Sequence, residues 1–520
     1  MRGRTAGTRV EADGESRVDP VSARIGAGSH YSVLSRANIP GGIAPLLLLA
    51  LLKLSVHLVT NAFGGYGYVR DELYYLACSD HMAWGYVDHP PLSVAVLWVS
   101  RLLFGDSLFA LRFLPAASGA TVVFLTGLLT RELGGGRYAQ ILAALCVIAA
   151  PLLLGMDSIF SMNSYEILLW TVAFYLIVLV LKREERKYWL FLGVALGLGL
   201  LNKISVLWLG AGLAVGLLLT SRRKMLLTPG PWIAAGVALL LFLPHIIWQV
   251  LNGYPTLEFI RNAGSGKYAA LSPVEMFLQQ ALFMNPLTLP IWLSGLIYFL
   301  TSKPGRPWRI LPLIYLVVFL ILAITKYVKA VYLGPLFPML FATGAISVEQ
   351  FVLALHWRWI KPAILVLVLG AGIALAPFVI AVLPVETYIS YAQALGVAPA
   401  TAEKNELGRL PQHFADMFGW EKMVESVAQA YESLSPDEKT KCAILCNNYG
   451  EAGAIDFFGR RYRLPGSICG HNNYWLWGPG DATGEVVIRL GGSPEAFRAA
   501  YAEVTQAGLF KDEYCMPYEN

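Results

Sequence analysis

The sequence predicts an all-α polytopic membrane domain of about eleven transmembrane helices, followed by a C-terminal α/β domain outside the membrane. Three observations lead to this fold class. The chain has 520 residues, of which 56% are hydrophobic and 14% are charged, against roughly 25% charged in an average soluble domain. Many apolar runs approach the length that spans a bilayer as a helix. From about residue 385 onward, charged residues, Gly and Pro reach the frequencies of an ordinary soluble domain.

The segment before the first apolar run, residues 1–40, is polar and rich in Gly and Ser, with basic and acidic side chains interspersed. It is too long and too acidic for the n-region of a cleaved signal peptide. We therefore expect a disordered cytoplasmic tail, followed by a transmembrane domain over residues 41–384. The net charge of +5 is small and the basic residues fall in short clusters, so nucleic acid is a poor candidate partner.

Short basic connectors predict the orientation, because Lys and Arg accumulate in cytoplasmic loops. With the N-terminus inside, eleven spans place every strongly basic connector inside: 131–137, 182–187, 221–224, 303–309 and 356–361. The loop after the first span, the 249–275 loop and the C-terminal domain then lie outside. The apolar stretch 92–105 is short and contains Arg101, so we expect it at the membrane interface. Lys326 and Lys329 are exceptions to the charge pattern, and such exceptions can indicate a local function.

Residues 385–520 contain segments with the periods of both strands and helices. "KCAILCNNY" and "GEVVIRL" are typical of strands, whereas "EKMVESVAQAYESL" and "SPEAFRAAYAEVTQAG" are typical of helices. Four of the six cysteines lie here, at Cys442, Cys446, Cys469 and Cys515. Disulfides are permitted outside the cytosol, but no spacing fixes a pairing. A zinc site is the less favoured alternative, because two of these cysteines fall within one predicted strand.

The loop after the first span is rich in acids and aromatics. The stretch "VRDELYYLACSDHMAWGYVDHPPL", residues 69–92, holds four acids and two histidines and is stiffened by Pro90 and Pro91. A solvated connector is the simplest interpretation. The density of acids beside a rigid Pro-Pro instead favours a place where a water-borne or lipid-borne acceptor meets a donor held in the membrane.

Several segments are similar to motifs of one enzyme family. "RDELYY" at 70–75 resembles an acidic first-loop motif, and "DHPPL" at 88–92 resembles a Pro-Pro-Leu element in which relatives often carry Lys where His89 stands. "GLGLLNKISVL" at 197–207 resembles a segment that presents a lysine outside, and "KAVYLGPLFPML" at 329–340 a late segment with Lys and Tyr. Together they resemble the GT-C membrane glycosyltransferases over roughly residues 45–345. The similarity is closest to bacterial family 39-like enzymes related to protein O-mannosyltransferases and to the aminoarabinose transferase that modifies lipid A.

The resemblance implies a multi-pass protein of the bacterial inner membrane. It also implies inverting-type transfer, on the extracytoplasmic side, from a polyprenyl-phosphate-linked sugar to a lipid, glycan or protein acceptor. The tail motifs "NNYGEAGAIDFFG" and "GHNNYWLWGPG" resemble an uncharacterised bacterial branch, which does not supply the acceptor. Membrane lipids and the lipid-phosphate donor are thus the expected partners. The cofactor stays open, with a divalent cation as one option.

Such a reaction needs a carboxylate that accepts a proton from the acceptor, which accelerates transfer roughly 10²–10⁴-fold. Asp71 is the predicted base. Glu72 points elsewhere if the segment is helical, so it is predicted to orient Asp71 or to hold a metal. Asp88 and His89 could complete the acceptor or metal site. The alternative for the first two acids is a plain helix-start pair that serves the helix dipole.

The departing phosphate needs cations, because negative charge develops there as the bond to the sugar breaks. Lys203 lies between two very apolar half-spans, where a charge is usually functional; snorkelling to the interface is its alternative role. Asn163 and Glu166, at the start of the fourth predicted span, could face the same cavity. A helix cap explains Asn163 almost as well.

Three further residues are predicted to contact the donor phosphate. Lys329 and Tyr332 follow the charge exception near the ninth span. Lys267 lies in the Gly-containing loop "RNAGSGKYA", which could close over the donor or serve as a plain connector.

Two other classes of function stay open. A transporter or lipid flippase would also need many spans and a few charges within the membrane, although the sequence shows no convincing pair of repeats with broken helices. The remaining alternative is an inactive scaffold whose outside domain binds a partner.

Overall fold

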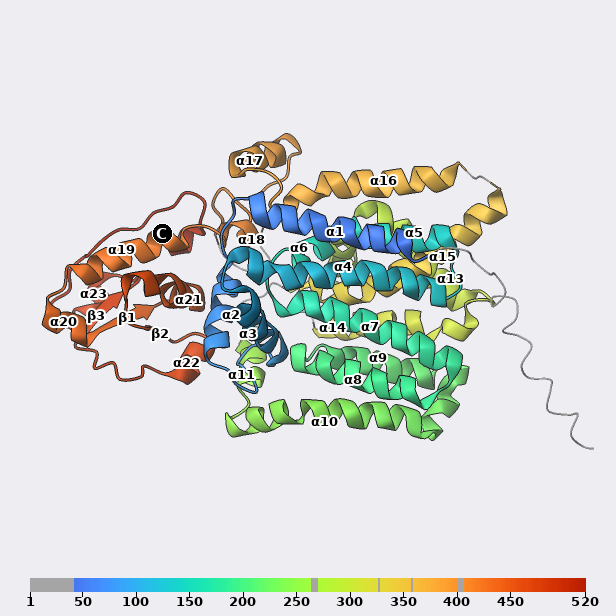
Figure 1. The fold of residues 1–520 in the computed structure, drawn as a ribbon, viewed down its shortest axis with the longest axis horizontal. Helices are drawn as coiled ribbons and strands as arrows, with labels where there is room; N and C mark the ends of the chain where they lie inside the picture. Colours follow the sequence, from blue (N-terminus) through green and yellow to red (C-terminus); the bar gives the residue numbers. More distant parts are fainter. Residues whose placement is uncertain (1–41, 263–269, 326–327, 357–358, 401–405) are drawn as a thin grey trace, which may run out of the picture. The chain divides into compact units, whose positions relative to one another are not determined.

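The structure is a computed structural model that describes residues 42–262, 270–325, 328–356, 359–400 and 406–520. Residues Gly41–Asn520 form one compact unit. Within this unit, long helices lie side by side and a small sheet lies beyond one end of the helical bundle (Figure 1). The described part of the chain is mostly helical, as the sequence predicted.

Six helical segments of the described residues are long and apolar enough to cross a membrane. They are α1 (Ala44–Phe63), α4 (Leu108–Glu132), α7 (Met162–Arg183), α10 (Pro229–Leu251), η7 (Ala330–Leu336) with α15 (Phe337–Leu355), and α16 (Ile360–Leu375) with η8 (Ala376–Phe378). The chain is therefore a multi-pass membrane protein.

Three pairs of helices would each make one more span across a sharp bend, giving at most nine spans in the described residues. The pairs are α5 (Arg137–Ile148) with α6 (Pro151–Asp157), bent by 63°, α9 (Val206–Leu218) with η3 (Ser221–Leu227), bent by 112°, and α12 (Pro273–Phe283) with η5 (Pro286–Thr288) and α13 (Leu289–Thr301), bent by 103°. Shorter helices are α3 (Leu92–Phe104), α8 (Arg186–Asn202) and α14 (Ile310–Thr325). The predicted eleven spans are not confirmed, because bends divide several of the apolar runs.

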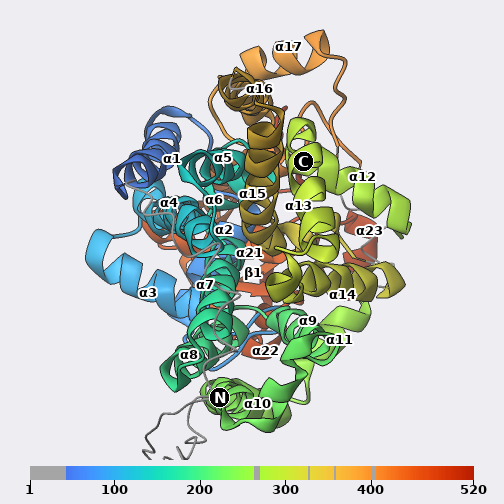
Figure 2. The same cartoon turned by 90° about the vertical axis from the view of Figure 1, so that its right-hand side faces the viewer.

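The bundle is packed in pairs of neighbouring helices. Helix α1 packs on α4, α8 on α10, α9 on α14 and α13 on α15 (Figure 2). The last pair approaches most closely at Gly295 and Gly344, where a Cβ on Gly295 would lie 2.4 Å from the Gly344 nitrogen. Such small-residue contacts let the backbones of membrane helices meet. The side chains of Trp170 and Trp292 are fully buried in this core.

The C-terminal part contains a parallel sheet in the order β2-β1-β3, formed by β1 (Cys442–Cys446), β2 (Ser467–Cys469) and β3 (Val486–Arg489). Ile444 lies opposite Ser467 on one side and Ile488 on the other. Strands β1 and β3 fall within the two segments predicted as strands. The helices of this part are α17 (Val385–Ala394), α18 (Gln412–Ala415), α19 (Trp420–Glu432), α20 (Pro436–Lys441), α21 (Tyr449–Phe458), α22 (Asn473–Trp477) and α23 (Pro494–Phe497), with the turns η9 (Gly459–Tyr462) and η10 (Pro517–Glu519).

One predicted helix of this part is wrong. The segment "SPEAFRAAYAEVTQAG" forms only the four-residue α23, and residues 502–508 are neither helix nor strand. Most of its side chains are exposed, and Phe497, Tyr501 and Val504 are only partly buried, so the apolar face that the sequence pattern suggested has little packing to stabilise it. A short helix without a packing partner is marginal in water.

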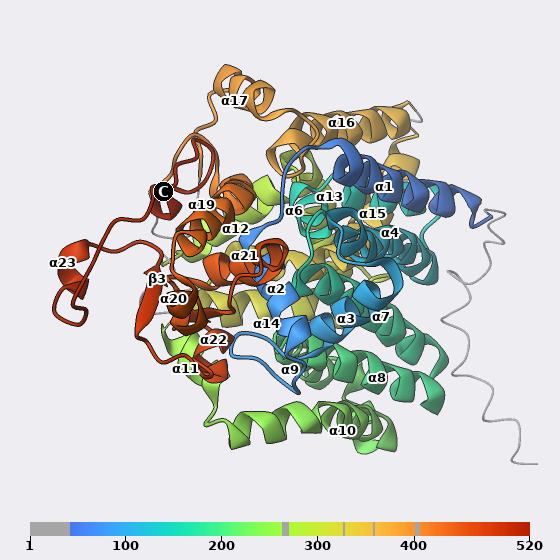
Figure 3. The ribbon, with the colours of Figure 1, turned by 60° about the vertical axis from the view of Figure 1, so that its left-hand side comes forward.

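The first loop and the C-terminal part share one hydrophobic core. Helix α2 (Arg70–Asp80) lies beside α21 (Figure 3), and Leu73, Ile444 and Ala452 belong to the same buried cluster. A Cβ on Gly453 would lie 2.7 Å from the backbone of Leu73, so the two helices require glycine at that position. The predicted domain boundaries at 40/41 and 384/385 stay predictions.

Candidate active site

The predicted catalytic pair occupies the first turn of α2, where its two members differ completely in environment. Glu72 is fully buried. Its carboxylate accepts two hydrogen bonds from the Arg112 guanidinium, at 2.8 and 2.7 Å, and one each from the backbone N–H groups of Val69 and Phe160, at 2.9 and 2.7 Å. A carboxylate offers about four lone-pair directions, so none is left for a metal or a proton. The geometry assigns Glu72 to holding the loop in place and gives no support to its predicted catalytic role.

Asp71 points away from this buried pair. About half of its side chain, 51%, is exposed. The hydroxyl of Tyr449, at the start of α21, donates to Asp71 Oδ1 at 2.7 Å, and Arg70 Nε lies 3.9 Å from the same oxygen. Burial, followed by the neighbouring Asp71 charge, raises the pKa of Tyr449 well above its ordinary value. This shift favours the protonated tyrosine, which is the form that donates the hydrogen bond to Asp71.

Asp88 joins the same face through a second buried tyrosine. Tyr74 donates to Asp88 Oδ1 at 2.9 Å, and Asn472 Nδ2 donates to Oδ2 at 3.3 Å. The rings of Tyr74 and Tyr449 lie 5.0 Å apart, centre to centre. Asp71 on α2 and Asp88 in the connector that follows α2 are thus each held by a tyrosine hydroxyl, and the two tyrosine rings are neighbours.

His89 is buried among aromatic rings. It stacks on Tyr75 at 4.7 Å and 18°, and its Nδ1 lies 3.0 Å from the Pro90 carbonyl oxygen. Its Nε2 is buried without a hydrogen bond among the described residues and lies 3.9 Å from Asp88 Oδ1. Pro90 and Pro91 directly precede α3, and Pro91 already has helical backbone angles; the predicted extended backbone at His89 stays a prediction.

A second cluster brings together four of the predicted residues. Lys203 Nζ donates to Glu166 Oε2 at 2.7 Å and to Asn163 Oδ1 at 2.8 Å, and it lies 5.0 Å from the centre of the Tyr332 ring. Ser205 donates to the other Glu166 oxygen. Lys203 occupies the break between α8 and α9 in an extended conformation, so this break falls where the sequence predicted it. The ammonium group has three N–H donors, and these contacts use two.

The segment between α6 and α7 links the two clusters. The N–H of Phe160 donates to Glu72, the N–H of Met162 donates to Tyr75 Oη at 3.3 Å, and Asn163 accepts from Lys203. Asn202, next to Lys203, donates to the Met162 carbonyl at 2.8 Å. Phe160 and the first turn of α7 therefore contact both Glu72 and Tyr75 of α2 and the Lys203 cluster.

The remaining predicted residues are placed less closely. Lys329 precedes η7, and its carbonyl accepts from the N–H of Tyr332 at 3.1 Å. Lys267 lies outside the described residues. The described residues contain no group of three or more His, Cys, Asp or Glu side chains that could hold a metal, and all six cysteines are buried free thiols.

Sequence reasoning missed Tyr449 and Arg70 as neighbours of Asp71. Arg70 lies over the Tyr449 ring at 5.2 Å and donates to Tyr518 Oη at 2.6 Å. The available signal was "NNYGEAGAIDFFG", which the sequence analysis singled out without assigning it to the site. Tyr449 and Asp71 are 378 residues apart, too far for local patterns to connect them.

Comparisons with known proteins agree with this architecture. Residues 88–248 match the family described as dolichyl-phosphate-mannose-protein mannosyltransferase. The chain is 26% identical over 297 residues to undecaprenyl phosphate-alpha-4-amino-4-deoxy-L-arabinose arabinosyl transferase 1 of Pseudomonas fluorescens, which covers 54% of this chain and 50% of the relative. The chain thus spans about half the length of this curated relative.

Solved structures extend the similarity to most of the chain. ArnT from Cupriavidus metallidurans bound to undecaprenyl phosphate aligns with a TM-score of 0.60 at 16% identity, over 91% of this chain and 97% of ArnT. The archaeal oligosaccharyltransferase AglB from Archaeoglobus fulgidus, in complex with an inhibitory peptide and a dolichol-phosphate, aligns with a TM-score of 0.52 at 13% identity, over 82% of this chain and 64% of AglB. This chain has the fold of the GT-C membrane glycosyltransferases. The resemblance predicted from its motifs is thereby confirmed.

Proposed function

We propose that this protein transfers a sugar from a polyprenyl-phosphate donor to a cell-envelope acceptor at the extracytoplasmic face of a bacterial inner membrane. The observation that carries the proposal is the half-exposed Asp71 carboxylate, which Tyr449 holds at the start of α2. The relatives support the donor class, because their names specify undecaprenyl phosphate or dolichyl phosphate. In this orientation the N-terminus is cytoplasmic and residues 385–520 are outside.

In the proposed reaction, the oxygen or nitrogen of the acceptor attacks the anomeric carbon of the donor sugar, and Asp71 accepts the proton that this oxygen or nitrogen loses. The bond from this carbon to the phosphate oxygen breaks, the electron pair leaves with the polyprenyl phosphate, and the configuration inverts. General-base assistance of this kind contributes roughly 10²–10⁴-fold. Asp88, held by Tyr74 and Asn472, is proposed to orient the acceptor.

Lys203 is proposed to meet the donor phosphate with its third N–H donor. Glu166 and Asn163 fix the ammonium at 2.7 and 2.8 Å, so the group needs little reorganisation as charge develops on the leaving phosphate. Because Glu166 already balances the resting charge, a second cation is required for the product. Lys329, beside Tyr332, and Lys267 are the proposed sources.

The test is transfer by the purified full chain in lipid nanodiscs. Membrane lipid extracts carrying radiolabelled polyprenyl-phosphate sugars serve as donor and an envelope extract as acceptor, and both free polyprenyl phosphate and labelled acceptor are measured. Stoichiometric appearance of the two products supports the proposal. Movement of the labelled lipid from one leaflet of a vesicle to the other, without formation of product, would favour the flippase alternative. If neither transfer nor movement is detected, the inactive scaffold is the remaining alternative.

A further inference from the structure

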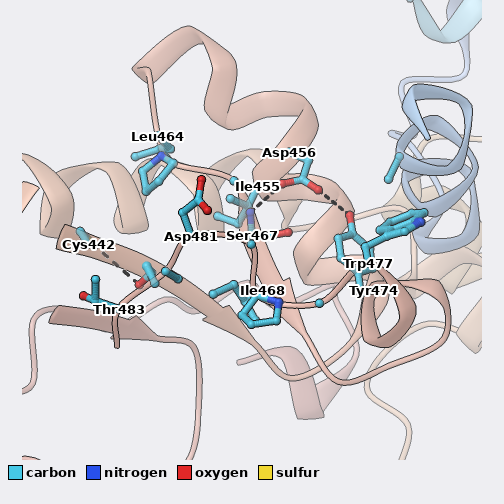
Figure 4. A pocket seen from close by; sticks show the side chains of 18 of the residues that line it. Cys442, Ile455, Asp456, Leu464, Ser467, Ile468, Tyr474, Trp477, Asp481 and Thr483 are labelled. Atoms are coloured by element: carbon cyan, nitrogen blue, oxygen red, sulfur yellow. Dashed lines mark hydrogen bonds between the residues drawn. The ribbon is translucent and has the colours of Figure 1, made fainter. Parts of the chain in front are cut away.

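A pocket of about 670 Å³ lies between the C-terminal part and the end of α2 (Figure 4), and neither Asp71 nor Asp88 lines it. The end of α2, strand β1, and the loops before β2 and after α22 form its walls. This volume is within the range of small-molecule sites. None of the residues proposed for sugar transfer lines this pocket, so the proposed reaction does not explain it.

Aromatic side chains form one wall of the pocket. The Trp477 ring stacks on His81 at 4.3 Å and 21°, and Tyr474 meets Trp477 edge-on at 4.8 Å. These contacts hold Trp477 in one orientation while leaving it partly exposed. A fixed, partly exposed aromatic face buries the apolar C–H face of a ring-shaped ligand at low entropic cost.

Hydrogen-bonding groups face the same space. Asp456 accepts from Tyr474 Oη at 2.7 Å and from the N–H of Ser467 at 2.9 Å, which fixes its carboxylate (Figure 4). Asp481 is exposed and makes no hydrogen bond or ion pair with any residue that the structure describes. In the view of Figure 4, Asp481 lies on the side of the pocket opposite Trp477. Carboxylates can only accept when ionised, so they suit ligands rich in hydroxyl donors.

The rim of the pocket is open backbone. Gly478 and Gly480 have φ angles of +74° and +57°, and a Cβ at either position would meet nothing within 4 Å. Glycine permits these left-handed turns without strain, and no side chain covers the peptide groups there. Residues 478–480 are exposed; the N–H of Gly478 donates to the Tyr474 carbonyl and the N–H of Ala482 to the Pro479 carbonyl, so the remaining backbone groups of this turn are the ones that a polar ligand can reach.

The charges exclude an anion as the best ligand. The lining residues Arg460 and Lys441 are both ion-paired: Arg460 lies 2.5 Å from Asp80, which it shares with Arg101 at 2.7 Å, and Lys441 lies 3.0 Å from Glu485. Three carboxylates line the pocket, those of Asp80, Asp456 and Asp481, against these two cations. This balance favours a neutral polyhydroxyl ring over a phosphate or an acidic sugar.

We propose that this pocket binds a neutral saccharide and anchors the acceptor at a distance from the chemistry. Asp71 and Asp80 are nine positions apart on α2, which is about 14 Å along a helix axis. A single sugar in the pocket cannot reach Asp71, so the acceptor is an extended glycan of several rings. The acceptor role rests on the proposed function, but saccharide binding does not.

The test is binding of defined probes to the full chain, purified in a detergent that has no sugar headgroup. The probes are neutral trisaccharides of glucose, mannose and N-acetylglucosamine, together with trigalacturonic acid and trialanine, and binding is followed by saturation-transfer NMR. We expect at least one neutral trisaccharide to bind. Trp477→Ala and Asp481→Asn should each weaken that binding by about tenfold.

Trp475→Ala is the matched control, because Trp475 is 73% exposed, lies two residues away and does not line the pocket. Its affinity should stay within about twofold of the native protein. Asp481→Asn changes an exposed side chain, so it tests the pocket even if Trp477→Ala fails to fold. Preference for trigalacturonic acid or trialanine, or absence of all neutral binding, would overturn the inference. Sugar transfer with no saccharide binding would contradict this inference alone, and saccharide binding without transfer would contradict only the proposed function.

Discussion

The first turn of α2 carries two adjacent acids, one on its inward face and one on its outward face, which differ in burial and in hydrogen bonding. Glu72 faces inward, is fully buried and has every lone pair satisfied by Arg112 and two backbone groups. Asp71 faces outward, is half exposed and accepts one tyrosine hydroxyl. An acid that reacts needs an unsatisfied, reachable oxygen, whereas an acid that supports the fold needs none. The inward face therefore fixes the position from which the outward face can work.

The largest expected effect is on the inward face. Glu72→Gln removes the charge that balances Arg112 and leaves a buried guanidinium unpaired, which costs about 3–5 kcal/mol. We expect a large fall in melting temperature and in yield from membranes, measured by fluorescence-detected size exclusion after heating. A variant that melts normally but transfers no sugar would restore Glu72 to the catalytic assignment.

The outward face should respond in activity rather than in stability. Asp71→Asn keeps size and hydrogen bonding but removes the proton acceptor, so turnover should fall by at least about a hundredfold, or about 2.7 kcal/mol. Asp106→Asn is the matched control, because Asp106 is 42% exposed, is ion-paired with Arg101 and lies in the connector between α3 and α4. If Asp71→Asn retains turnover while Asp88→Asn loses it, the two acids have exchanged roles.

The same contrast separates two lysines within the bundle. Lys203 is 12% exposed beside Glu166, whereas Lys53 is fully buried against Asp157 at 2.6 Å. Lys203→Met should lower the maximal rate by about tenfold to a hundredfold and weaken donor binding, with a smaller loss of stability than Lys53→Met, because Lys203 is partly exposed and Ser205 still donates to Glu166. Lys53→Met should lower the melting temperature, because it leaves a buried carboxylate unpaired. Equal losses of stability in both variants would make Lys203 a structural residue.

The sequence predicted the helices of the bundle well, because long apolar runs have few alternatives in a membrane. It could not predict which runs bend: α12 and α13 read as one continuous span, yet their axes differ by 103°. Asp71 and Lys203 were singled out because charges are rare in such a chain, and their roles stay predictions. Their partners were not found, since hydrogen bonds such as Tyr449 to Asp71 depend on how the C-terminal part packs on α2. Local patterns also favoured a helix after Ser493 that has no surface to pack on.

Tyr449 links the C-terminal part of the chain to the outward face of α2, because its hydroxyl donates to Asp71. Tyr449→Phe keeps the ring packed on Tyr74 but deletes the hydrogen bond to Asp71, worth about 1–1.5 kcal/mol, so kcat should fall by about tenfold. If the tyrosine acts by positioning the base, the acceptor KM should stay unchanged and the melting temperature should fall no more than in a control that loses one comparable hydrogen bond. Tyr514→Phe deletes a hydrogen bond of equal length to Glu386, at 2.7 Å, and should leave kcat unaltered. A change in KM alone would instead place Tyr449 in acceptor binding.

The smallest expected effect concerns a pair of acids behind Asp71. Asn448 Nδ2 donates both to Glu451 at 3.2 Å and to Glu519 at 3.1 Å. Burial, followed by the charge of Glu451, raises the pKa of Glu519 from its ordinary value of 4.5 to about 8. Because the folded protein holds this proton more tightly than the unfolded chain, its contribution to stability is fully present below about pH 4.5 and is lost as pH rises toward 8. The native protein should therefore melt at a lower temperature at pH 8.5 than at pH 6.

The Glu519→Gln variant has a neutral side chain at every pH. Between pH 6 and pH 8.5 its melting temperature should therefore fall by a few degrees less than that of the native protein. Glu513→Gln provides the control, because Glu513 is 62% exposed and paired with Arg409, and it should keep the native pH dependence. Since α21 begins at Tyr449, directly after Asn448, ionisation of Glu519 would loosen the helix that holds Asp71. A pH dependence that survives Glu519→Gln unchanged would show that another group titrates, and the link between this acid pair and the outward face of α2 would fail.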